Sequence, residues 1–176
     1  MLRIGLISDT HGHFDEKLSV FFKDVDEIWH AGDIGTWSVI EKLKQICPNV
    51  KAVYGNIDGH EFRAEYPEHL IWETEGFKVW MTHIGGYPNH YSPAVKKLLA
   101  TVKPDIFICG HSHILRVMRD QKYNNMVAMN PGAAGVHGWH KIKTVLRFNL
   151  HEKKILNLEA IELGLRGKIE SNDNGW

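Results

Sequence analysis

Short apolar runs alternate with amphipathic segments through the first third of the chain. The runs 2–8, 27–30 and 50–54 have the length and apolar content of buried strands. Between them, segments 15–23 and 36–46 place apolar side chains at helical spacing. This order of strand and helix predicts a layered α/β domain in which the strands run parallel.

The second half of the chain contains more strands and fewer helices. A helix that opens with proline is expected at 93–102, and strands are expected at 77–83, 105–109, 115–119, 126–129, 144–150 and 155–161. Short polar turns join several of these strands, as in a meander. The pattern predicts a second, more antiparallel sheet that packs on the first, with helices outside.

The chain has 176 residues, of which 43% are hydrophobic. This length supports one well-buried core and is short for two typical domains. We therefore expect a single domain over residues 1–165, followed by a polar tail over 166–176.

Charge and cysteine content limit the partners that we expect. The chain carries 21 basic and 21 acidic side chains, so no global field favours long nucleic acid or an anionic membrane. No stretch approaches the roughly 20 apolar residues of a membrane span. Met1 leads directly into the first apolar run without a signal peptide, and we expect Cys47 and Cys109 to be reduced thiols. Both features favour a cytoplasmic location.

Polar residues of metal-ligand type follow the apolar runs. The set comprises Asp9, His11, Asp33, Asn56, His83, His111 and His113. Asp9 and His11 form one pair with the spacing i, i+2, and His111 and His113 form another. In extended backbone this spacing places both side chains of a pair on one face. Taken singly, each motif also has a structural explanation, as a capped turn or a strand-end residue. Taken together, they predict a shared crevice at the carboxyl ends of strands.

Seven ligands exceed the need of one ion. Two ions that share a bridging carboxylate would use all of them, and Asp33 is central in the set. Two ions about 3.5–4 Å apart suit the in-line displacement of a phosphoryl group. Oxygen and nitrogen ligands without thiolate indicate two divalent transition-metal ions per chain, with manganese first and iron, nickel or zinc as alternatives.

The order of these motifs resembles that of the calcineurin-like metallophosphoesterases. The likeness extends from residue 1 to about residue 160, and includes Gly55-Asn56-Ile57-Asp58, Gly110-His111-Ser112-His113 and Asn130-Pro131-Gly132. It is greatest to the small single-domain branch that holds bacterial and archaeal phosphodiesterases and the Vps29-type subunit of retromer. The resemblance implies an α/β fold: a four-layer α/β/β/α sandwich of two mixed β-sheets flanked by helices.

The resemblance also implies a division of the ligands. The first metal ion would be held by Asp9, His11, Asp33 and His113, and the second by Asp33, Asn56, His83 and His111. Asp33, Asn56, His83 and Asp58 are thereby also expected to take part in catalysis. Asp58 would either orient a ligand histidine or be a turn residue. The expected function is a metal-dependent phosphodiesterase, in which a bridging hydroxide attacks a small phosphodiester or nucleotide in line.

One residue departs from the family pattern. Many phosphomonoesterases of the family have a histidine that protonates the leaving group where this chain has Ile57. The residues that could replace it are His60, His90 and His137, each of which can also be an ordinary surface residue.

Other functions remain open on the sequence. A phosphomonoesterase and a non-catalytic, metal-binding scaffold for protein interaction are the alternatives. Trp37, Tyr87 and Trp139 can line the mouth of the site or a homo-oligomer interface, or can be core or scattered surface residues.

Overall fold

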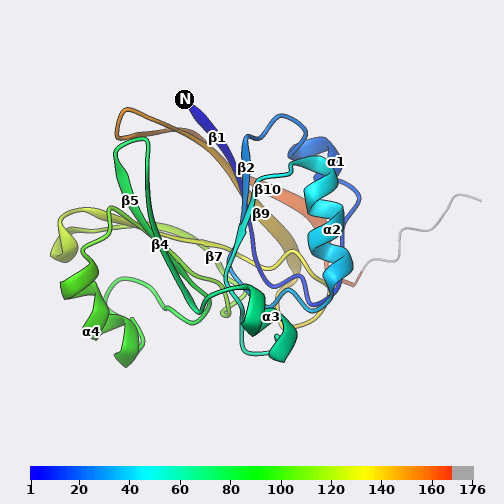
Figure 1. The fold of residues 1–176 in the computed structure, drawn as a ribbon, viewed down its shortest axis with the longest axis horizontal. Coiled ribbons are helices and arrows are strands. Elements are labelled where there is room, and N and C mark those ends of the chain that lie inside the picture. Colours follow the sequence, from blue (N-terminus) through cyan, green and yellow to red (C-terminus); the bar gives the residue numbers. More distant parts are fainter. Residues whose placement is uncertain (168–176) are drawn as a thin grey trace, which may run out of the picture.

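Two five-stranded β-sheets pack face to face and carry helices on their outer faces (Figure 1). This computed structural model describes residues 1–167, and the predicted tail from residue 168 onward lies outside the described residues. The four-layer sandwich of two mixed sheets is therefore confirmed.

The first sheet has the strand order β10-β9-β1-β2-β3. Its strands are β1 (Leu2–Ile7), β2 (Glu27–His30), β3 (Val50–Ala52), β9 (Ile142–His151) and β10 (Lys154–Leu165). Strands β1, β2 and β3 run parallel, while β9 is antiparallel to both β1 and β10. Helices α1 (Leu18–Phe21) and α2 (Trp37–Ile46) cover the outer face of this sheet.

The second sheet has the order β4-β5-β6-β8-β7. Its strands are β4 (His69–Thr74), β5 (Phe77–Thr82), β6 (Ile106–Ile108), β7 (Leu115–Asp120) and β8 (Met126–Pro131). The central strands β5, β6 and β8 run parallel, and β4 and β7 flank them in the antiparallel direction. Helix α4 (Pro93–Val102) packs on the outer face, and a 3-10 turn spans Gln121–Tyr123.

Apolar residues that alternate along the strands fill the space between the sheets. Leu6, Trp29 and Phe148 from the first sheet and Met81 and Ile108 from the second belong to one buried cluster. Burial of this kind contributes about 25 cal/mol per Å² of apolar surface, and it fixes the two sheets against each other. The strand ends of both sheets are therefore held at one edge of the sandwich.

The structure differs from the sequence prediction in the placement of two strands. We expected β9 and β10 to belong to the second sheet, but they complete the first. The first sheet is thus mixed, and the second has a parallel centre rather than a simple meander. The predictions also missed β4 and helix α3 (His60–Glu65). No helix in the described part of the chain is both long and apolar enough to cross a membrane.

Candidate functional site

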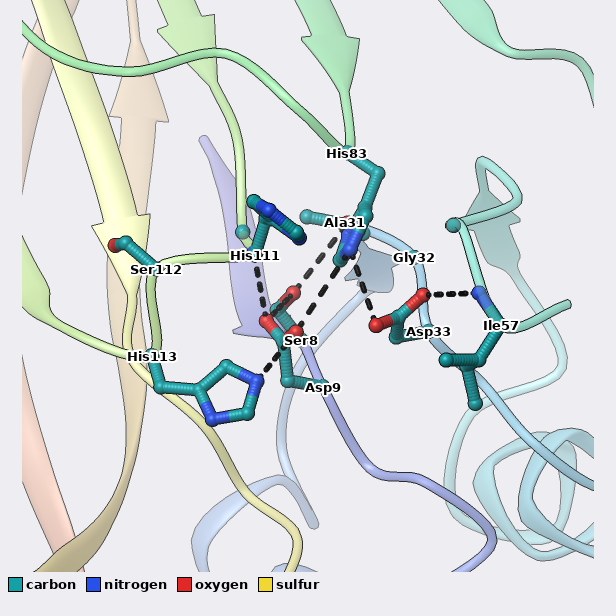
Figure 2. Close-up of polar contacts among 12 residues, drawn as sticks. Ser8, Asp9, Ala31, Gly32, Asp33, Ile57, His83, His111, Ser112 and His113 are labelled. Carbon is teal, nitrogen blue, oxygen red and sulfur yellow. Dashed lines mark hydrogen bonds and ion pairs between the residues drawn. The ribbon is translucent and has the colours of Figure 1, made fainter. Parts of the chain in front are cut away.

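The residues that we singled out as ligands gather at one edge of the sandwich (Figure 2). Asp9 follows β1 and Asp33 follows β2. Asn56 follows β3. From the second sheet, His83 follows β5 directly, and His111 lies just beyond β6. Because these five strands all run parallel to a neighbour, their carboxyl ends bring the side chains together across the two sheets.

The backbone at this edge is left-handed at most of the ligand positions. Positive φ values occur at Asp9 (54°), His11 (47°), Asp33 (55°), His111 (66°) and His113 (59°). Both i, i+2 pairs therefore lie in turns, and our expectation of extended backbone was wrong. A non-glycine residue in this region costs about 1–3 kcal/mol, and such strain concentrates at functional sites.

Asp9 is fully buried, and its two oxygens face different partners. Its Oδ2 accepts hydrogen bonds from Ser8 Oγ at 2.6 Å and from the His111 amide at 3.1 Å. Its Oδ1 has no hydrogen-bond partner, although His113 Nε2 lies 3.0 Å away. One oxygen thus fixes the carboxylate, and the other is left directed at the imidazoles.

Asp33, which follows β2, is arranged like Asp9: a backbone amide holds one carboxylate oxygen, and the other oxygen faces imidazoles. Its Oδ1 accepts a hydrogen bond from the Ile57 amide at 3.0 Å. Its Oδ2 lies 3.2 Å from His83 Nε2 and 3.4 Å from His11 Nε2. Burial opposes ionisation of Asp33, but these partners, with His83 foremost, hold its pKa below the usual range.

The ligand atoms form two groups, in each of which they lie within 4.8 Å of one another. The first consists of Asp9, His11 and His113, and the second of Asp33, His83 and His111. Two atoms bound at about 2.1 Å to one ion lie about 3 Å apart when they subtend a right angle, which matches the shortest separations here. Buried Nε2 atoms of His11 and His83 lack hydrogen-bond partners, as does Asp9 Oδ1. The donor set therefore fits divalent metal ions.

A backbone carbonyl holds His83 in the tautomer that suits metal ligation. Its Nδ1 lies 2.8 Å from the oxygen of Ala31, which can only accept, so Nδ1 carries the proton. In the neutral ring the lone pair is then on Nε2, which faces the carboxylates. Burial disfavours the charged ring, but Asp33 and Asp9 raise the pKa of His83 above its usual value, so an ion that binds there displaces a proton.

Gly32 allows the close approach of β2 to His83. Its φ is +93°, and a Cβ atom at this position would lie 2.7 Å from Nδ1 of His83. Any side chain would therefore displace the imidazole or the turn.

Asp58 acts on the backbone rather than on a ligand histidine. Its carboxylate accepts hydrogen bonds from the amides of Ile34 (3.1 Å), Gly35 (2.9 Å) and Gly55 (2.7 Å). Of the two roles that the sequence left open for Asp58, these contacts support that of a turn residue. Asp58 joins the loops that follow β2 and β3, and so positions Asp33 and Asn56.

Two supporting residues, His30 and Asn130, were not found from the sequence as functional. His30 is fully buried, accepts from the Gly32 amide at 3.2 Å and contacts Thr10 Oγ1 at 3.0 Å. Burial lowers the pKa of His30 to about 4. Asn130 donates to the Gly110 carbonyl at 2.8 Å and supports the turn that carries His111. Their signal was weak, because each is a single polar residue within an apolar strand.

The remaining predicted residues lie at or beyond the rim. Asn56 is exposed and lines a cavity together with His83, while Ile57 lies beside Asp33 (Figure 2). Of the three alternative histidines, only His137 contacts a ligand ring, with centroids 5.0 Å from His11. His60 is exposed at the start of α3, and His90 is exposed against Tyr87.

The three aromatic residues have separate environments. Trp37 stacks on Phe62 with ring centroids 4.4 Å apart, and Tyr87 lies under Arg116. Trp139 is 100% exposed on the loop that also carries His137. Trp37 is therefore a packing residue, and Trp139 is the aromatic side chain of the three that is free for contact.

Comparisons with known proteins agree with this geometry. Residues 2–153 match the model of the calcineurin-like phosphoesterase superfamily domain. A "probable metallophosphoesterase" of Methanothermobacter thermautotrophicus is 34% identical over 140 residues, covering 76% of this chain and 77% of that protein. The chain belongs to the calcineurin-like phosphoesterase superfamily, whose members use divalent metal ions, and it is a hydrolase of phosphoric esters.

Solved structures share the fold at lower sequence identity. An archaeal phosphodiesterase superposes with a TM-score of 0.73 at 22% identity, covering 92% of this chain and 99% of that one. Vps29 of Entamoeba histolytica in complex with Zn²⁺ gives a TM-score of 0.69 at 14% identity, with coverages of 93% and 100%.

Proposed function

We propose that this enzyme is a phosphodiesterase that hydrolyses a small phosphodiester or nucleotide at a binuclear metal centre. The observation that carries the proposal is the position of Asp33 Oδ2, which is 3.4 Å from His11 Nε2 and 3.2 Å from His83 Nε2. These two histidines belong to different ligand groups. A carboxylate between the groups can serve two ions.

In this proposal each ion has four protein ligands. Asp9, His11, Asp33 and His113 hold the first ion, and Asp33, Asn56, His83 and His111 hold the second. Manganese is our first candidate, with iron, nickel and zinc as alternatives, since all ligands are oxygen or imidazole nitrogen. Bound ions would offset the charge of the phosphoryl oxygens and favour ionisation of the attacking water.

A cavity beside the second group supports a small substrate. It has a volume of about 550 Å³ and is lined by Asn56 and His83 on the side of the metal ligands. Ile84 and Val95 contribute apolar lining, and Arg63 and Glu68 contribute charges of opposite sign. This volume is within the usual range for small-molecule sites, and the mixed lining suits one arm of a diester.

The residue at position 57 favours a diester over a monoester. Ile57 is 45% exposed, and its apolar side chain lies beside Asp33 (Figure 2). It neither donates a proton to a leaving oxygen nor attracts the second negative charge of a monoester dianion.

The bridging role is tested by two substitutions. We expect Asp33→Asn to abolish phosphodiesterase activity at saturating manganese, because it removes charge from both ions. Asn56→Ala affects one ion and should retain measurable turnover. Steady-state kcat on an aryl phosphodiester and metal content by elemental analysis are the measurements. Equal losses in the two variants, or one ion per native chain, would contradict the binuclear centre.

The alternatives are distinguished by the same assay. A phosphomonoesterase would cleave monoesters faster than diesters. A protein-interaction scaffold would release no product from a panel of phosphate esters supplied with manganese, iron, nickel or zinc. A cytoplasmic location and a possible homo-oligomer remain predictions.

A further inference from the structure

The loop of residues 135–140, between β8 and β9, lies against one of the two ligand groups. His137 is tilted over His11 with ring centroids 5.0 Å apart, and His140 meets His113 edge-on at 5.1 Å. His11 and His113 are the two histidines of the first group. The loop thus forms an outer layer around the ligands of the first ion.

Hydrogen bonds through His140 determine which nitrogen of His113 carries a proton. Nε2 of His140 lies 2.8 Å from the carbonyl oxygen of Gly135, which can only accept, so this nitrogen is the donor. In the neutral ring, Nδ1 then has the lone pair. Nδ1 of His140 lies 3.2 Å from Nδ1 of His113, so His113 donates in this contact.

A proton on Nδ1 of His113 determines the state of Nε2 on the opposite side of the ring. With the proton on Nδ1, Nε2 of His113 keeps its lone pair, and it lies 3.0 Å from the unpaired Oδ1 of Asp9. Ligation of a metal ion requires this tautomer and this orientation.

The loop is built to reach His113 closely. Gly138 has a φ of +122°, and a Cβ atom at this position would overlap the His113 ring. Arg166 fixes the loop by donating from Nε to the carbonyl of His140 at 2.8 Å and from Nη1 to that of Val136 at 3.2 Å. Arg166 is the first residue of the predicted tail, yet it bonds to the domain.

The second ligand group is supported differently. Its buried histidine, His83, receives the same tautomer from the main-chain carbonyl of Ala31, at the end of β2. A side-chain substitution cannot remove the carbonyl that supports His83, but it can remove the imidazole of His140 that supports His113. The two ion sites therefore have separable supports.

We propose that His140 is a positioning residue for the first metal ion, which holds His113 in the tautomer and orientation that ligation requires. The inference rests on the proposed binuclear centre. Loss of an outer partner of this kind lowers metal affinity about 10–100-fold. We expect the affinity for one of the two ions to fall and the affinity for the other to stay unchanged.

Calorimetric titration of metal-free protein with Mn²⁺ tests the proposal. We expect the native protein to bind two ions, and His140→Leu to bind one with unchanged affinity and the other about 10–100-fold more weakly. His140→Gln, whose amide can both accept from His113 and donate to Gly135, should recover part of the loss. His151→Leu is the matched control at the other end of β9, where His151 faces Glu75, and it should leave both affinities unchanged.

Nitrogen-15 NMR of the metal-free protein gives a readout that needs no ion. At pH 8 we expect His113 to carry its proton on Nδ1 in the native protein, and to populate both tautomers in His140→Leu. A native His113 that lacks a proton on Nδ1, or both Mn²⁺ affinities intact in His140→Leu, overturns the proposal. If His140→Leu fails to fold, the tautomer of His113 in the native protein is sufficient to test the proposal. A native protein that binds one ion would instead overturn the binuclear centre.

Discussion

In the proposed function, Ile57 is the residue that sets the preference for diesters over monoesters. It occupies the position at which many monoesterases of the family have a histidine, and its backbone amide, rather than its side chain, contacts Asp33 at 3.0 Å. In the proposed function, stabilisation of the leaving oxygen would then fall to the bound metal ions alone. We therefore expect the rate to depend steeply on leaving-group acidity, with aryl esters cleaved much faster than alkyl esters.

Substitution of Ile57 tests this expectation. Ile57→His should flatten the dependence of kcat/KM on leaving-group pKa and raise monoesterase activity, because a positioned acid contributes about 10²–10⁴-fold. A series of substituted aryl phosphates and phosphodiesters is the measurement, and Ile57→Leu is the control that should keep the native slope. A native enzyme that cleaves alkyl monoesters with little leaving-group dependence would contradict this interpretation. In that case His137, which contacts His11, is the next residue to replace.

At the level of single residues, the ligand types were evident from the sequence and their supports were not. Asp9, Asp33 and His83 could be identified because a carboxylate or imidazole directly after an apolar run is chemically conspicuous. His140 and Arg166 could not, since each acts through the backbone or another side chain of a patternless loop. The left-handed ligand positions also gave no signal, because none of those residues is glycine.

At the level of elements, the loops that follow β2 and β3 depend on one carboxylate. Asp58 is 2% exposed and accepts from three backbone amides. We expect Asp58→Ala to lower the free energy of unfolding of the metal-free protein by at least about 2 kcal/mol, since unpaired buried amides cost about 1–3 kcal/mol each. Urea denaturation is the measurement. Asp24→Ala, at an exposed surface position, is the control and should change stability by less than about 0.5 kcal/mol.

His30 connects the loops after β1 and β2 and makes stability depend on pH. Burial lowers its pKa to about 4, below the value of about 6.5 in an unfolded chain. Its contribution is therefore complete above pH 6.5 and is lost as the pH falls through 4; the difference is on the order of 3 kcal/mol. We expect the unfolding free energy of metal-free protein to fall over this range, and more steeply than in His30→Gln. Identical slopes in the two proteins would contradict this assignment.

Elements with a strong period were predicted more reliably than short or half-buried ones. Helix α2 was found because its buried residues recur at helical spacing, and strand β5 because it is a largely apolar run that is buried almost throughout. Helix α3 has six residues, too few to show a period, and β4 is an edge strand without a fully buried residue. The assignment of β9 and β10 to a sheet depends on β9 pairing with β1, which local sequence does not encode.

At the scale of the whole molecule, the ligands come from both sheets, so ion binding should stabilise the entire sandwich. Free manganese at a hundredfold excess over the dissociation constant contributes about 2.7 kcal/mol per site to the native state. We expect the melting temperature to rise by roughly 5–10 °C for one site relative to chelated protein. Calorimetric scans with manganese and with a chelator are the measurement. The rise should be smaller in Asp33→Asn, and an equal rise in that variant would mean that the stabilising ions bind elsewhere.

The topology also has a consequence for biosynthesis. Asp9 lies near the start of the chain, but its partner in the first ligand group, His113, emerges from the ribosome more than a hundred residues later. Strand β1 pairs with β9, which ends at His151, so this pairing can be completed only after a still longer part of the chain has been synthesised. We therefore expect metal loading to be a late event in the synthesis of the chain, because the first ligand group is incomplete until His113 has been made.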